Sequence, residues 1–204
     1  MKYVFATLRT AAALAIVIAI VAQFQSTAAG TEVNPFNFFG YFTMQSNIIA
    51  AAAFALSAFF IFRERAQPSW LSYLRALATV VMAIVGLVYN TLLADAGLDG
   101  SFNVPWSNDI LHVWIPIYAV LDWVLFGDKV KLPFDKLWVM LIYPAIWLVV
   151  VLIRGANDGW VPYPFLDPAT GYPSVGVYCL LIAAVTILFG YGAYALSRTR
   201  ILRP

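Results

Sequence analysis

Two short polar clusters interrupt an otherwise apolar sequence and carry side chains that could do chemistry. The first is FTMQSN (42–47), which contains Thr43, Ser46 and Asn47; the second is NDILH (108–112), which ends at His112, the only histidine. A hydroxyl is a weak nucleophile until a positioned base takes its proton, and histidine is the most common such base. The residue types therefore predict a base-activated threonine, provided that the fold brings the two clusters together.

The composition indicates the environment in which these clusters lie. Of the 204 residues, 63% are hydrophobic and 11% are charged, whereas about a quarter of the residues in soluble domains are charged. We therefore expect a single transmembrane domain over residues 1–204 with no separate soluble domain. The net charge of +2 gives no reason to expect nucleic acid as a partner.

Six apolar segments approach the ~20 residues that a helix needs to span a bilayer. They cover approximately residues 8–26, 38–62, 70–93, 106–126, 134–153 and 174–197. The alternating pattern of a membrane barrel is absent, so we predict an all-α bundle of six transmembrane helices. Residues 1–29 also have features of a cleavable signal peptide, but their apolar run is long for one, and we expect them to be retained.

The distribution of cations predicts the orientation. If the six segments cross the membrane in turn, eleven of the twelve Lys and Arg residues fall on the side that holds both termini, and only Arg154 lies on the other side. Cytoplasmic loops are enriched in Lys and Arg. We therefore expect both termini to be cytoplasmic.

The same threading predicts that the two polar clusters meet. Segments 38–62 and 106–126 cross in the same direction, and at ~1.5 Å per residue Thr43 and His112 lie about 8 and 9 Å inside their external starts. Asn108 and Asp109 precede His112 by four and three residues, so either could orient the imidazole. Asp122 lies roughly 15 Å further along the axis, too far for that role.

Three side chains are candidate hydrogen-bond donors to a developing oxyanion, namely Asn47, Ser46 and Asn90. Structural roles are the alternative, because polar residues within spans often only bond to a neighbouring helix or to their own backbone. Pro116 and Pro144 are expected to kink their helices. The connection 154–173 is expected either to cap a cavity or to anchor at the membrane surface.

Other function classes stay open at this stage. A lipid- or small-molecule-binding membrane protein would need the same pocket without turnover. A transporter is less well supported, because few titratable groups lie within the spans and no inverted repeat is visible. One histidine and one cysteine do not form a conventional zinc site, so we expect neither a metal nor a cofactor. The sequence does not indicate an oligomeric state.

Three motifs resemble a known family. NDILHVWIPIYAVLDW (108–123), YFTMQSN (41–47) and DGWVPYPFLD (158–167) are similar, in this order, to segments of the androgen-induced/ADTRP family of multi-pass membrane hydrolases. The resemblance implies a bacterial relative in the cytoplasmic membrane. It also implies Thr43 as nucleophile, His112 as catalytic histidine, and a lipid ester such as a fatty acid ester of a hydroxy fatty acid as substrate. The QSN after Thr43 and the position of Pro116 depart from the family pattern, which bears on the substrate more than on the fold.

Overall fold

The computed structural model describes residues 1–30, 32–93 and 104–202, and this part of the chain is helical without any strand. The five long helices are α1 (Lys2–Gly30), α3 (Phe42–Phe62), α4 (Ser69–Val88), α7 (Val139–Asn157) and α8 (Tyr172–Leu196); the shorter ones are α2 (Pro35–Phe38), α5 (Pro105–Asp109) and α6 (Ile115–Leu125). A π-helical turn, Tyr89–Leu93, continues α4, and another, Ile110–Trp114, joins α5 to α6. The predicted all-α class is confirmed.

Five helices among the described residues are long and apolar enough to cross a membrane: Lys2–Gly30, Phe42–Phe62, Ser69–Leu93, Phe134–Asn157 and Tyr172–Leu196. This agrees with a multi-pass membrane protein. The expected sixth segment, 106–126, is a helical run from Pro105 to Leu125 but is not one of the five. Asn108, Asp109, His112 and Asp122 make this run more polar than the others. The sixth crossing stays a prediction.

Several helix ends differ from the predicted ones. α1 begins at Lys2 rather than near residue 8 and ends at Gly30 rather than at 26, and α7 continues past 153 to Asn157. Hydropathy marks only the apolar part of a helix, whereas backbone hydrogen bonding continues into polar flanks. At the end of α7, for example, the Asp158 N–H donates to the Arg154 carbonyl at 2.8 Å.

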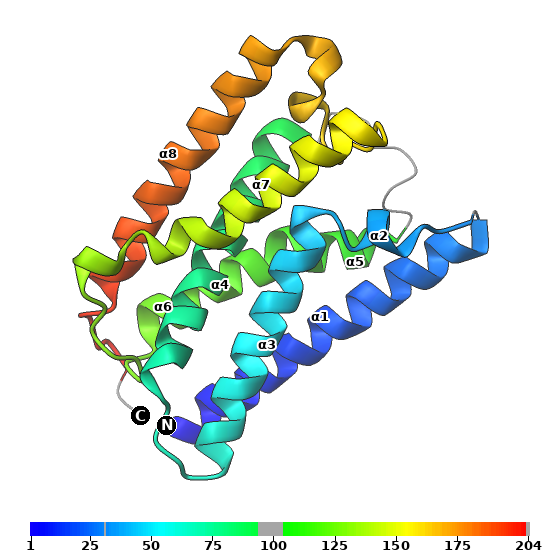
Figure 1. Ribbon diagram of the computed structural model, residues 1–204. Coiled ribbons are helices and arrows are strands. Elements are labelled where there is room, and N and C mark those ends of the chain that lie inside the picture. The colour runs from blue at the N-terminus through cyan, green and yellow to red at the C-terminus, as the bar shows by residue number, and fades with distance from the viewer. Residues whose placement is uncertain (31, 94–103, 203–204) are drawn as a thin grey trace.

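The helices form one bundle with both termini at the same end (Figure 1). α1 packs along α3, α3 packs on α4, and α4 also contacts α6 and α8. Both α1 and α3 have buried alanines, including Ala12 and Ala19 on α1 and Ala50 and Ala53 on α3. Small side chains let apolar helices approach closely, and close packing is what holds helices together in lipid. α7 and α8 lie on one side of this core and bury a smaller share of their residues.

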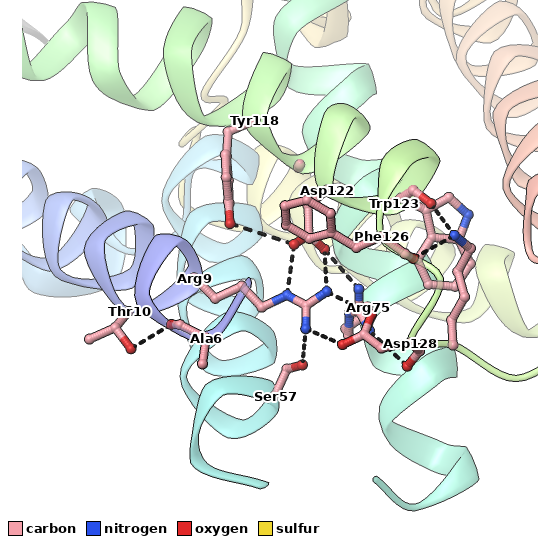
Figure 2. A network of polar contacts seen from close by, with 12 residues as sticks. Ala6, Arg9, Thr10, Ser57, Arg75, Tyr118, Asp122, Trp123, Phe126 and Asp128 are labelled. Atoms are coloured by element: carbon pink, nitrogen blue, oxygen red, sulfur yellow. Dashed lines mark hydrogen bonds and ion pairs between the residues drawn. The ribbon is translucent and has the colours of Figure 1, made fainter. Parts of the chain in front are cut away.

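A cluster of four charged side chains joins the helices near the termini (Figure 2). Arg9 on α1 binds both oxygens of Asp122 on α6, with Nε–Oδ1 and Nη2–Oδ2 distances of 2.7 and 3.2 Å, and it also binds both oxygens of Asp128. Arg75 on α4 reaches the same two carboxylates at 2.8 and 3.0 Å. We call these four residues the ion cluster. They balance one another in charge; Arg9, Arg75 and Asp122 are buried, and the Asp128 side chain is 8% exposed.

The ion cluster corrects one part of the sequence interpretation. Arg9 and Arg75 are among the eleven cations that the orientation prediction places on the side of the termini. Their side chains, however, are only 0% and 1% exposed and lie inside the bundle. A charge removed from water is tolerated when it is paired and hydrogen-bonded. All five N–H groups of Arg9 have acceptors, because its Nη1 also donates to the Ser57 hydroxyl. Asp122 thus belongs to a structural connection between α1, α4 and α6.

Candidate functional site

Thr43 lies in the first turn of α3 and is only 4% exposed. One turn later, the Asn47 side-chain amide donates to two backbone carbonyls, that of Thr43 at 2.9 Å and that of Leu111 at 3.1 Å. Leu111 directly precedes His112 in the π-helical turn. The first turns of α3 therefore lie against the segment that carries the histidine, and the predicted meeting of the Thr43 hydroxyl with the imidazole stays a prediction.

His112 is buried within the π-helical turn and has two defined neighbours. Its Nδ1 lies 3.1 Å from the Asn108 backbone oxygen, and its ring stacks on that of Tyr89 with centroids 4.1 Å apart. A carbonyl oxygen can only accept a hydrogen bond, so this contact places the hydrogen of neutral imidazole on Nδ1. Nε2 then carries the lone pair and is the nitrogen able to act as a base. π-helical turns inside α-helices occur frequently at functional sites.

The other candidate residues divide into two groups. Ser46 and Asn47 are fully buried on α3. Asp109 and Asn90 are exposed, and the Asn90 amide donates to the Gly86 carbonyl of its own helix. The structure does not bring these two to the site. The Asn108 backbone carbonyl, rather than a carboxylate, orients the imidazole, while the Asn108 amide donates to the Tyr89 hydroxyl.

An apolar cavity of about 270 Å³ adjoins Thr43. Its walls come from α3, α4, α7, α8 and the connection between α7 and α8, and include Thr43, Tyr89, Pro144, Tyr163, Cys179 and Thr186. The volume is at the small end for ligand pockets, which span ~300–1,000 Å³. His112 stands behind Tyr89, whose ring forms part of the wall. Among the described residues, no three metal-ligating side chains gather.

The connection after α7 contributes directly to the cavity. It forms two 3-10 turns, Pro164–Leu166 and Pro168–Thr170, and Tyr163, Phe165 and Leu166 all line the cavity. This favours the capping role over plain surface anchoring. The Tyr163 hydroxyl lies near the start of α3 and accepts the Thr43 N–H at 3.4 Å. Burial raises the pKa of Tyr163 to about 12, so the hydroxyl keeps its proton at neutral pH.

Sequence reasoning missed the two tyrosines that frame the site. Tyr89 ends the segment 70–93, and Tyr163 lies in the aromatic connection 158–167. Both resemble ordinary interfacial aromatics, which gather at membrane boundaries. A usable signal for Tyr163 was its position between two prolines, Pro162 and Pro164, which restrict the backbone on either side of it.

Comparison with known proteins adds no family to these observations: no family model, no curated protein and no solved structure matches this chain.

Proposed function

We propose that this protein is an intramembrane hydrolase of lipid esters, with Thr43 as nucleophile and His112 as base. The observation that carries the proposal is the position of Thr43. It is a buried threonine at the wall of an apolar cavity, on a helix turn that Asn47 ties to the segment of His112. The resemblance of the three motifs to the androgen-induced/ADTRP hydrolases supports the same assignment.

The proposed reaction is acyl transfer through the threonine. His112 Nε2 takes the Thr43 proton, directly or through one water, as Oγ1 attacks the ester carbonyl carbon. The tetrahedral intermediate collapses, the bond to the leaving oxygen breaks, and His112 returns the proton to that oxygen. A water molecule, deprotonated by His112, then attacks the acyl-threonine; the bond between the acyl carbon and Thr43 Oγ1 breaks, His112 returns the proton to Oγ1, and the fatty acid leaves. The apolar cavity would hold hydrocarbon next to the scissile bond.

We also propose that Pro105–Leu125 forms a sixth crossing and that both termini are cytoplasmic. The support comes from the termini lying together (Figure 1) and from the cations outside the ion cluster, such as Arg63, Lys131 and Arg198, which belong to the same side in this threading. The site would then lie toward the external leaflet. A protein of the bacterial cytoplasmic membrane fits this arrangement.

A non-catalytic binding protein is the second candidate, and one observation favours it. The Tyr89 ring, rather than the His112 ring, borders the cavity. A lipid- or small-molecule-binding protein would need only the apolar walls. The two candidates differ in what happens to Thr43, since only a hydrolase needs its hydroxyl to react.

A fluorophosphonate probe and a long-chain chromogenic ester test the proposal on the purified protein. We expect the probe to label wild type and Thr43→Ser, and expect Thr43→Ala and His112→Ala to lose both labelling and turnover. Thr186→Ala is the matched control, because Thr186 also lines the cavity but its hydroxyl donates to the Ile182 carbonyl. Unchanged ester turnover in Thr43→Ala would overturn the hydrolase proposal. Ester binding without turnover in wild type would establish the binding protein instead.

A further inference from the structure

Tyr163 is placed where a reaction at Thr43 would need a hydrogen-bond donor. Its side chain is only 7% exposed and borders the same cavity as Thr43. Its oxygen accepts the Thr43 N–H at 3.4 Å, and the two side-chain hydroxyls also interact. The phenol thus contacts both the backbone and the hydroxyl of the proposed nucleophile, although the two residues are 120 positions apart in the sequence.

Aromatic contacts fix the position of this hydroxyl. The Tyr163 ring stacks on Phe165 with an interplanar angle of 7°, meets Tyr41 edge-on at 5.8 Å, and lies 5.9 Å from Trp147. Trp147 itself donates its indole N–H to the Gly40 carbonyl, just before α3. Catalytic donors act well when packing holds them in place before the reaction begins. Tyr163 meets that condition.

The hydrogen of this phenol is available for donation. The Tyr163 oxygen accepts the Thr43 N–H, and the contact with the Thr43 hydroxyl opposes burial by lowering the pKa of Tyr163, as a donor to the phenol oxygen does, so neither contact uses the hydroxyl hydrogen. The first N–H groups of a helix also have no partner within the helix, and Tyr41, the residue before α3, provides no side-chain cap. The phenol therefore lies at the start of α3, in contact with Thr43, and its hydrogen can point to a group bound there.

We propose that Tyr163 is a further catalytic residue, whose O–H donates to the oxyanion formed when Thr43 attacks an ester; this rests on the function proposed above. As the Thr43 Oγ1–carbon bond forms, the carbonyl π electrons move to the ester oxygen, and the Tyr163 hydrogen bond stabilises that negative charge. Tyr163 keeps its proton throughout. When the intermediate collapses, the electron pair returns, the bond to the leaving oxygen breaks, and that oxygen receives its proton from His112.

Steady-state hydrolysis of a long-chain chromogenic ester by Tyr163→Phe tests this role. Loss of one oxyanion donor lowers kcat by about 10²–10³-fold, and we expect that fall with KM changed only a few-fold. Tyr143→Phe is the matched control. The Tyr143 hydroxyl is also part-buried near α3, where it donates to Gln45 Oε1 at 3.3 Å. Unlike Tyr163, Tyr143 is not among the residues that line the cavity. We expect its kcat to match wild type.

The possible outcomes separate this inference from the hydrolase proposal. If Thr43→Ala is inactive but Tyr163→Phe keeps the wild-type kcat, with or without a raised KM, the role of Tyr163 is overturned and the hydrolase proposal stands. Full turnover in Thr43→Ala would instead refute the hydrolase itself. Should Tyr163→Phe not fold, 3,5-difluorotyrosine at position 163 keeps the ring and the hydroxyl but makes the phenol more acidic. A kcat and alkaline pH limit identical to wild type would then count against donation by Tyr163.

Discussion

Replacing Asp122 with asparagine removes one negative charge from the ion cluster without changing the size of the side chain. The Asp122 carboxylate is 2% exposed and accepts from Arg9 Nε at 2.7 Å, Arg9 Nη2 at 3.2 Å and Arg75 Nη2 at 2.8 Å. In Asp122→Asn, two buried guanidiniums would share one carboxylate. Breaking a buried ion pair by removing one partner costs about 3–5 kcal/mol. We expect a loss of that size in the free energy of unfolding.

The assay is denaturant unfolding in mixed detergent micelles, followed by circular dichroism. Glu64→Gln is the control: it makes the same chemical change in an exposed pair with Lys2, where solvent screens the charges, and we expect no measurable loss. The double variant Asp122→Asn/Arg75→Gln restores neutrality and leaves the Arg9–Asp128 pair intact, so it should be more stable than Asp122→Asn alone. Equal stability of Asp122→Asn and wild type, or further loss in the double variant, would refute the reasoning.

Three further predictions concern the cavity and the loop after α6. Cys179→Phe should fill the cavity and lower turnover of long-chain esters more than that of acetyl esters. The neighbouring Leu180 faces outward at 73% exposure, so Leu180→Phe should leave the ratio of long-chain to acetyl ester turnover unchanged. Burial, together with the charge of Arg75, lowers the pKa of Lys129 from 10.5 to about 8. The unfolded state then binds more protons between those values, so the free energy of unfolding should rise from pH 8 to 10.5, and the rise should disappear in Lys129→Met. Burial alone would raise the pKa of Asp128, but hydrogen bonds and charge from the two guanidiniums outweigh it and hold the pKa well below 3.8. The free energy of unfolding should therefore fall as the pH drops below 3.8. A free energy of unfolding that does not change in this acid range would contradict the pairing.

The fold was predictable from the sequence where long apolar runs determine it. Runs such as 42–62 and 172–196 can satisfy their backbone in lipid only as helices, so their class follows from composition. The segment 106–126, also predicted as a span, is helical over Pro105–Leu125 but is not among the five long apolar helices. Its polar residues reduce the hydropathy signal because they are used inside the bundle, Asp122 with two arginines and Asn108 with Tyr89. A hydropathy scale assigns each residue its free-energy cost of transfer into lipid, and it takes no account of a partner residue that offsets this cost.

For the site, depth along a helix predicts that Thr43 and His112 lie at nearly the same level, because rise per residue is nearly constant. The contact between the Asn47 amide and the Leu111 carbonyl agrees with that reasoning. Tyr163 could not be placed in this way, since its position depends on how a proline-rich connection folds back over the bundle. Depth along a helix says nothing about such connections.

The two polar regions of the bundle differ in the kind of buried atom that lacks a hydrogen-bond partner. In the ion cluster, Arg9 uses every donor it has and the carboxylates balance the guanidiniums, and the atom left over is a donor, Arg75 Nε. Around the π-helical turn of His112, the atoms left over are acceptors: the buried side-chain oxygens of Asn47 and Asn108 have no hydrogen-bond partner within the described residues. Buried polar atoms are normally paired, so unmet capacity in a dry interior calls for a specific explanation. A water molecule or a polar lipid group that donates to these two oxygens would supply the missing bonds.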